Sequence, residues 1–395
     1  MRVFFTITVP MISGPPKGGS RVSIRPRRPT QPAAAGNPTR FGAVESAVTN
    51  QTPLPKIPLN VLDLASREHG ATNADAVAGS IRLAQTAERL GYDRFWVAEH
   101  HGMPAIASSA PAVLIAGIAA ATERIRVGSG GVMLPNHASL VIAEQFGTLR
   151  ALYGDRIDLG IGRAPGTDGA TALALRRVVS TGPEAQQGLG VDEFPQQLID
   201  LLGFFHGGMS ETNPLRGIIA VPGLGDAPQM WLLGSSGYSA QVAAALGLPF
   251  AFAHHFAGDD TEAALAMYRS RFTPSAHLAE AHCMIAVNVI SDEDPEVVRA
   301  QSLPSLIAFL QLRQGKKPQP VSIEDALAYE FSPLEQEFIA ARNRRQAVGT
   351  PAHVRSQLAS LLESTGADEL MVTSGAATVD ARIRSLEVVA DLFRA

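Results

Sequence analysis

Short runs of apolar, β-branched and aromatic residues alternate along the chain with longer segments whose apolar residues recur every three or four positions. From Lys56 onward, eight such runs occur, at residues 57–64, 94–98, 125–129, 157–162, 230–233, 249–253, 284–289 and 369–372. The segments between them, for example 73–90, 111–121 and 139–152, have the spacing of amphipathic helices. Eight strands that alternate with helices predict an α/β fold, a (β/α)8 TIM barrel of parallel strands, rather than a doubly wound sheet.

Two connections are too long for a plain crossover helix, and they follow the fourth and the seventh predicted strands. Residues 163–228 hold one helical segment, at 193–205, and residues 291–366 hold Pro304, Pro318 and Pro320. Long loops at the mouth of a barrel usually shape or cover its pocket, although they can also be helical decoration of the rim. We therefore expect one barrel domain at 56–395, with long insertions after strands 4 and 7.

The first 55 residues differ from the rest of the chain. They contain seven Lys or Arg residues and a single acidic residue, Glu45, and they have neither helical nor strand periodicity. This composition predicts a disordered N-terminal extension. A start codon placed too early is an alternative, and the apolar stretch at 1–12 is a weak match to a secretory signal.

The overall composition points to a globular protein with a small-molecule partner. The chain has 395 residues, of which 46% are hydrophobic and 18% charged, and a net charge of -4, which gives no reason to expect nucleic acid or an anionic membrane as partner. The sequence contains no run of about 18 apolar residues, so no transmembrane helix is predicted. Cys283 is the only cysteine, so no intrachain disulfide can form, and a reducing cytoplasm is the expected location.

Reactive side chains follow several of the predicted strands. The second strand ends in Glu99-His100-His101, and the fourth ends in Arg163. The carboxyl ends of barrel strands meet at one mouth, where barrel enzymes carry their reactive groups. Because an imidazole beside a carboxylate can move protons near neutral pH, Glu99 and His100 are candidate catalytic residues, with a purely structural pair as the alternative.

The fifth strand is followed by a motif suited to phosphate. In Gly234-Ser235-Ser236-Gly237-Tyr238-Ser239, the glycines allow close approach of the backbone, and the hydroxyls of Ser235, Ser236 and Ser239 can donate. The first amides of the following helix, including that of Gly237, point toward an anion. A simple serine N-cap explains only one of the hydroxyls. Arg163 is a second candidate phosphate ligand, or a partner of Asp168 in a rim loop.

Two His-His pairs raise the alternative of a zinc hydrolase with a site at His100, His101, His254 and His255. Successive residues of an extended strand point to opposite faces, so each pair can send only one imidazole into the mouth. We therefore predict no metal site. The Gly-x-Gly-x-x-Gly fingerprint of dinucleotide-binding folds is also missing, which argues against a Rossmann dehydrogenase.

With these residues placed, the chain resembles the bacterial luciferase-like, flavin-dependent monooxygenase superfamily, in particular its stand-alone oxidoreductases. The resemblance extends from about Leu59 to Phe393. It rests on six blocks in the order of the family: VAEHH at 97–101, RVGSGGVMLPNH at 126–137, AEQFG at 143–147, GIGRAPGTD at 160–168, WLLGSS at 231–236 and GADELMVT at 366–373.

The resemblance implies a barrel that receives reduced FMN from a separate flavin reductase and forms a flavin C4a-hydroperoxide with dioxygen, which oxygenates a small organic substrate. By matching position, His100 resembles the family's active-site histidine, in proton transfer or in guarding the peroxyflavin. Ser236, Ser239 and Arg163 resemble its phosphate ligands, with Arg176 as a further one. Gly130 and Gly131 match the place where the family often has a non-proline cis peptide beneath the flavin ring. A homo-oligomer is also implied.

One position departs from the pattern and several functions stay open. Luciferase itself has a carboxylate where this chain has Ser235, which argues against aldehyde oxidation and light emission. The alternatives to an FMN-dependent monooxygenase are an enzyme that transfers hydride with coenzyme F420 on the same barrel, a non-catalytic flavin-binding protein, and the zinc hydrolase.

Overall fold

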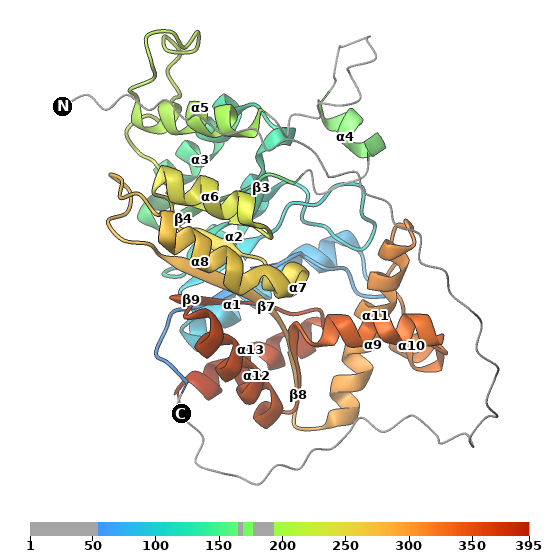
Figure 1. Ribbon diagram of the computed structural model, residues 1–395. Helices are drawn as coiled ribbons and strands as arrows, with labels where there is room; N and C mark the ends of the chain where they lie inside the picture. The colour runs from blue at the N-terminus through green and yellow to red at the C-terminus, as the bar shows by residue number, and fades with distance from the viewer. Residues whose placement is uncertain (1–53, 165–168, 177–192, 395) are drawn as a thin grey trace, which may run out of the picture. The chain divides into compact units, whose positions relative to one another are not determined.

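The eight predicted strands form a closed parallel barrel in a computed structural model, which describes residues 54–164, 169–176 and 193–394 (Figure 1). Neighbouring strands pair in parallel in the order β1 to β7, and β9 closes the barrel by pairing with both β7 and β1. The barrel strands are β1 (Leu59–Asp63), β2 (Arg94–Val97), β3 (Arg126–Met133), β4 (Ile157–Gly162), β5 (Gln229–Gly234), β6 (Phe250–Phe252), β7 (Cys283–Ser291) and β9 (Glu369–Thr373). The predicted (β/α)8 barrel is confirmed.

Helices surround these strands and connect each to the next (Figure 1). The predicted extension at 1–55 lies outside the described residues, apart from its last two. Within the described ranges, every helix is too short or too polar to cross a lipid bilayer. The helices are α1 (Asn73–Leu90), α2 (Pro111–Ala120), α3 (Ser139–Tyr153), α4 (Gly169–Arg176), α5 (Phe194–His206), α6 (Gly237–Leu246), α7 (His254–Ala257), α8 (Thr261–Arg271), α9 (Pro295–Arg313), α10 (Ile323–Ala328), α11 (Pro333–Asn343), α12 (Pro351–Thr365) and α13 (Val379–Arg394).

Helix α1 shows how local sequence sets the bounds of an element. Thr72 and Asp75 form a capping box, in which the Thr72 hydroxyl accepts from the Asp75 amide and the Asp75 carboxylate accepts from the Thr72 amide. Gly91 ends the helix with φ of 84°, a left-handed conformation that glycine adopts without steric cost. The predicted helix at 73–90 is therefore confirmed residue by residue.

The strands are continuous apolar runs because both of their faces are buried. Alternate residues point into the barrel, where Trp96 and Trp231 make an edge-on contact with ring centroids 5.6 Å apart, or outward against the helices, as Phe95 does. The amino end of the barrel is filled by an ion-pair network. There Arg94 donates to Asp158 at 2.8 Å and to Glu369 at 3.2 Å.

The insertion after β7 is more regular than the sequence suggests. It holds α9, α10 and α11, which lie together at one side of the barrel (Figure 1), and the short strand β8 (Gln346–Gly349). This strand pairs with the last residues of β7, Asn288 to Ser291, starting at the residue where the pairing of β7 with β9 ends. The insertion is thus attached to the barrel wall by a strand pairing as well as by its two chain connections.

Candidate functional site

The side chain of Glu99 joins the carboxyl ends of β2 and β3. It is fully buried, and its Oε1 accepts hydrogen bonds from His101 Nε2 at 2.9 Å and from His137 Nε2 at 2.8 Å. Its Oε2 accepts from the amide of Met133 at 3.0 Å. His137 follows the turn at the end of β3, 38 residues away from Glu99 in sequence, and sequence reasoning missed it.

Glu99 is therefore paired with His101 and His137, and no hydrogen bond to His100 is among its contacts. Burial alone would raise the pKa of Glu99, but the hydrogen bonds from His137, His101 and the Met133 amide lower it below the usual value. Glu99 stays ionised at neutral pH and is held in place by its partners. These bonds hold Glu99 in place at this end of the barrel, and its predicted role in proton transfer beside His100 stays a prediction.

His100 lies just beyond the carboxyl end of β2 and has an unpaired ring nitrogen. Its amide donates to Ser108 O at 2.9 Å, and its Nδ1 is buried without a hydrogen-bond partner among the described residues. Burial lowers the pKa of His100, against the opposite effect of Glu99, so the ring is neutral at neutral pH. A neutral imidazole with a free nitrogen can accept or donate one hydrogen bond to a bound molecule.

Gly130 and Gly131 are joined by a cis peptide bond in the middle of β3. A Cβ at Gly130 would lie 2.7 Å from Leu62 Cδ1, and one at Gly131 would lie 2.6 Å from Gly160 O. Glycine is therefore needed at Gly131, where the backbone of β4 leaves no space for a side chain, whereas at Gly130 the side chains of Leu62 and Trp96 would have to shift. The result is a stretch of bare backbone at the carboxyl end of the barrel.

Arg163 and the start of α6 lie next to each other, as the sequence predicts for a phosphate site. The Arg163 guanidinium carbon lies 4.2 Å from the centre of the Tyr238 ring, in the first turn of α6. Within the described part of the chain, Arg163 has no ion pair and no side-chain hydrogen bond. Its donors and the first amides of α6 are thus available to an anion.

The serines of this motif are not engaged in capping the helix. Ser236 is the N-cap residue of α6, yet its side chain makes no capping hydrogen bond. Ser239 is buried and lies against Gly234. A Cβ added at Gly234 would collide with the Ser239 side chain. Ser235 and Gly237 flank this N-cap, so the predicted cofactor residues of this loop come together, while Arg176 is the last residue of α4 and its side chain lies outside the described residues.

The second His-His pair is used differently at each position. His254 Nδ1 hydrogen-bonds Thr261 Oγ1 at 2.8 Å, and His255 Nδ1 donates to Ala286 O at 3.0 Å. With His101 bound to Glu99, three of the four histidines of the zinc hypothesis have separate partners. No cluster of three or more His, Cys, Asp or Glu side chains suited to a metal occurs within residues 54–164, 169–176 and 193–394.

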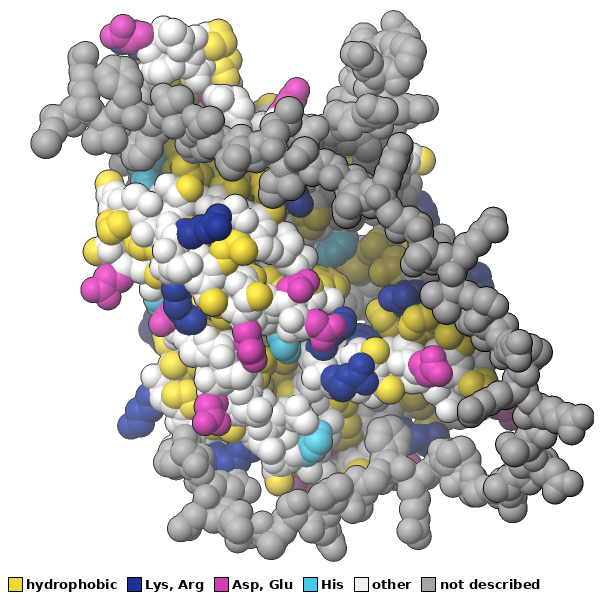
Figure 2. Space-filling view, viewed as in Figure 1, with side chains coloured by type: hydrophobic (Ala, Val, Ile, Leu, Met, Phe, Trp, Pro, Cys, Tyr) yellow, Lys and Arg dark blue, Asp and Glu magenta, His cyan; other side chains and the backbone are white. Residues whose placement is uncertain are grey.

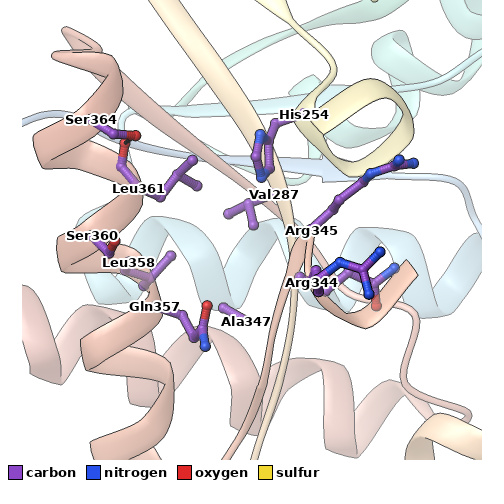
Figure 3. Close-up of a pocket in the computed structure, with 11 residues that line it drawn as sticks. His254, Val287, Arg344, Arg345, Ala347, Gln357, Leu358, Ser360, Leu361 and Ser364 are labelled. Atoms are coloured by element: carbon purple, nitrogen blue, oxygen red, sulfur yellow. Dashed lines mark hydrogen bonds between the residues drawn. The ribbon is translucent and has the colours of Figure 1, made fainter. Parts of the chain in front are cut away.

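A small pocket of about 160 Å³ lies between β7, β8 and α12 (Figure 3). Figure 3 shows His254 beside Val287, with side chains of α12 across the pocket from them. Apart from His254, it contains none of the predicted site residues. It is lined by His254, Val287, Arg344, Arg345, Gln346, Ala347, Gln357, Leu358, Ser360, Leu361 and Ser364.

Comparison with known proteins identifies the family. The family model described as luciferase-like monooxygenase matches residues 61–369. The chain belongs to the luciferase-like monooxygenase family. A luciferase-like monooxygenase of Escherichia coli (strain K12) is 44% identical over 339 residues, covering 85% of this chain and 97% of that protein. N-acetyl-S-alkylcysteine monooxygenase of Bacillus subtilis (strain 168) is 34% identical over 311 residues, covering 77% of this chain and 89% of that protein. The resemblance inferred from the six sequence blocks is confirmed.

Solved structures share the barrel. Apo-MsnO8 is similar with a TM-score of 0.74 and 35% identity, covering 86% of this chain and 98% of that chain. The oxygenating constituent of 3,6-diketocamphane monooxygenase from Pseudomonas putida, in complex with FMN, has a TM-score of 0.60 at 19% identity. The match covers 85% of this chain and 96% of that chain. An F420-dependent secondary alcohol dehydrogenase has a TM-score of 0.61 at 13% identity, and the match covers 86% of this chain and 100% of that chain. The last two show only a common fold.

Proposed function

We propose that the protein is a monooxygenase that uses reduced FMN and dioxygen to oxygenate a small organic substrate. The observation that carries this proposal is the set of unused polar groups at the carboxyl end of the barrel. Arg163 and the first turn of α6 lie together without an anionic partner among the described residues. The buried Nδ1 of His100 also lacks a partner there. These are the groups that a phosphate and a redox-active ring require.

The residues present fit FMN. Arg163, Ser236, Ser239 and the adjacent amides of α6 would hold the phosphate, because a guanidinium and a helix N-terminus both stabilise a dianion. We propose that the Gly130-Gly131 backbone lies beneath the flavin ring, because these residues match the position that the family pattern gives it. The space that a Cβ would take at either residue is filled by neighbouring atoms. The family relationship supports this assignment independently of the geometry.

Bound reduced FMN supplies the two electrons needed to activate dioxygen for oxygenation. The chain itself provides a neutral imidazole at His100, whose Nδ1 can hold or move one proton at the site. Glu99 holds His101, His137 and the end of β3 in place. No fingerprint for NAD(P) occurs in the sequence, so we propose that a separate reductase supplies the reduced flavin.

The relatives favour oxygenation over other chemistry on this barrel. One relative that covers most of this chain is named for monooxygenation of N-acetyl-S-alkylcysteine, at 34% identity. The F420-dependent dehydrogenase has only 13% identity, which carries no argument for its cofactor. FMN is therefore the cofactor that we propose.

Titration with oxidised and reduced FMN, followed by fluorescence and absorbance, tests the proposal. Wild-type protein should bind both forms saturably, and Arg163→Met should weaken binding roughly tenfold to hundredfold, as expected for a lost charge-assisted hydrogen bond. Arg124→Met is the matched control, because the Arg124 side chain is 72% exposed and precedes the amino end of β3. A folded protein that binds neither form would reject the proposal. Reduction of F420 without oxygen consumption would replace it with hydride transfer.

A further inference from the structure

Arg342, near the end of α11, has an unusual environment for an arginine. It is half-buried, its Nη1 donates to Ser305 O on α9 at 3.3 Å, and its guanidinium lies 5.0 Å from the centre of the Phe309 ring. Burial lowers the pKa of Arg342 to about 10, so the side chain is still charged at neutral pH. The insertion after β7 thus contains a largely desolvated positive charge.

This charge has no counter-ion among the described residues. Arg342 makes no ion pair with any Asp or Glu of the described part of the chain, whereas Arg94 pairs with both Asp158 and Glu369. Its neighbour Arg345 pairs with Asp259. Acidic and basic side chains lie side by side in places on the face drawn in Figure 2. A desolvated cation without an anion costs free energy, which the carbonyl and ring contacts of Arg342 offset only in part.

The position of Arg342 connects it with the barrel mouth. Its partner Ser305 lies against Gly375, directly after β9, where an added Cβ would be 3.4 Å from Ser305 Cβ. On the other side, burial lowers the pKa of His255 to about 4, and the charges of Arg342 and of His100 contribute to that shift. The contact of Ser305 with Gly375 thus places Arg342 near the carboxyl end of β9.

This place is distinct from the proposed phosphate site. Arg163 and Ser236 follow β4 and β5, whereas Ser305 and Gly375 lie where the ends of β7 and β9 meet. The ring of Phe309 is an apolar neighbour of Arg342, with its centre 5.0 Å from the guanidinium carbon. Leu303, Leu306 and Ile307 of the same helix are buried in a separate cluster with Ala326 of α10.

We propose that Arg342 binds the carboxylate of the substrate, so that the enzyme acts on apolar carboxylic acids whose hydrocarbon part extends toward His100. This inference rests on the proposed function, because it takes His100 as part of the oxygenation site. A guanidinium binds a carboxylate through two parallel hydrogen bonds, and it does so most strongly where water is excluded. Arg342 is then a specificity-determining residue, and it has no role in holding the cofactor.

Calorimetric titration with matched pairs of ligands tests this inference without turnover. Each pair consists of an acid and its primary amide: octanoate and octanamide, 4-phenylbutyrate and 4-phenylbutyramide, and N-acetyl-S-benzylcysteine and its amide. The titrations are made with and without oxidised FMN. For wild-type protein, we expect at least one carboxylate to bind roughly tenfold to hundredfold more tightly than its amide. Arg342→Met should remove this preference, and Arg344→Met, which changes an exposed arginine two residues away, should keep it.

Two further measurements separate this inference from its alternatives. FMN affinity of Arg342→Met should stay within about twofold of the wild-type value, because the proposed phosphate site does not include Arg342. Its Tm should be equal to or above that of the wild-type protein, because a desolvated charge is removed. The inference is overturned if no acid is preferred over its amide, if Arg342→Met keeps the preference, or if that variant loses FMN binding. Failure of FMN binding by the wild-type protein would reject the proposed function alone, since the titrations without FMN still report on Arg342.

Discussion

Glu99 and His100 are neighbours in sequence, and the structure gives them opposite roles that a pair of substitutions can separate. Glu99→Ala removes the acceptor of three hydrogen bonds, from His101, His137 and the Met133 amide. His100→Ala removes a ring whose Nδ1 has no partner among the described residues. The first change should therefore reduce stability, and the second should reduce reactivity.

The magnitudes follow from the contacts. A hydrogen bond to a charged group contributes about 1.5–3 kcal/mol, and breaking a buried charged cluster costs about 3–5 kcal/mol rather than the sum of its bonds. At about 1–2 °C per kcal/mol for a chain of this size, Glu99→Ala should lower Tm by roughly 3–10 °C. For His100→Ala, the loss of one half-buried side chain should cost about 1 kcal/mol.

Two assays read these effects separately. Thermal unfolding by circular dichroism measures stability, and the rate at which bound reduced FMN is oxidised in air measures reactivity. His100→Ala should change that rate at least about tenfold, because proton transfer typically contributes 10²–10⁴-fold to catalysis. Glu99→Gln is the matched control, because the Gln carbonyl oxygen can still accept from both histidines. The reasoning is refuted if Glu99→Ala unfolds within about 1 °C of the wild-type protein, or if His100→Ala leaves the oxidation rate unchanged.

Three other substitutions test the backbone surface and the amino end of the barrel. Gly131→Ala places a Cβ 2.6 Å from Gly160 O and should destabilise the protein by about 1–3 kcal/mol, whereas Gly117→Ala, with no atom within 4 Å of its Cβ, should stabilise it by about 0.5–1 kcal/mol. Denaturation midpoints measure both, and equal shifts of the two variants would contradict the argument. The pKa of His282 is raised chiefly by its hydrogen bond to Glu369 at 2.9 Å. The contribution of His282 to stability is therefore complete below the pKa that this residue has in the unfolded chain, and it is lost as pH rises through the pKa that it has in the folded protein. His282→Gln should therefore lower Tm more at about pH 6 than at about pH 9, and the opposite order would show that this ion pair is unimportant.

Strands with both faces buried were predictable because their sequences are continuous apolar runs, as in residues 157–162. Sequence analysis placed the end of β3 at Ser129, whereas the strand continues to Met133. Its two glycines are typical of a loop by composition, yet they remain in the sheet because the backbone of β4 approaches closely there. The strand β8 (Gln346–Gly349) was missed, because four residues of mixed polarity carry no periodic signal.

Candidate site residues were predictable where chemistry follows a strand directly. Arg163 and the start of α6 lie close together because the carboxyl ends of the barrel strands converge. The partners of Glu99 did not follow, because His137 approaches it only through the fold of the turn after β3. Arg342 had no sequence signal beyond a basic stretch at 342–345, since the lack of a counter-ion is a property of three-dimensional packing.

The attachment of β8 to the overhanging end of β7 has a consequence for the design of chimaeras between relatives. Ser291 Oγ donates to Gly349 O at 2.9 Å, and Asn288 Nδ2 donates to Gln346 Oε1 at 3.0 Å. A chimaera that exchanges only α9, α10 and α11 would combine β7 and β8 residues from different proteins at these contacts. Exchange of residues 288–349 as one segment would keep both sides of the pairing together. Substrate range could then be moved between family members without redesigning the barrel.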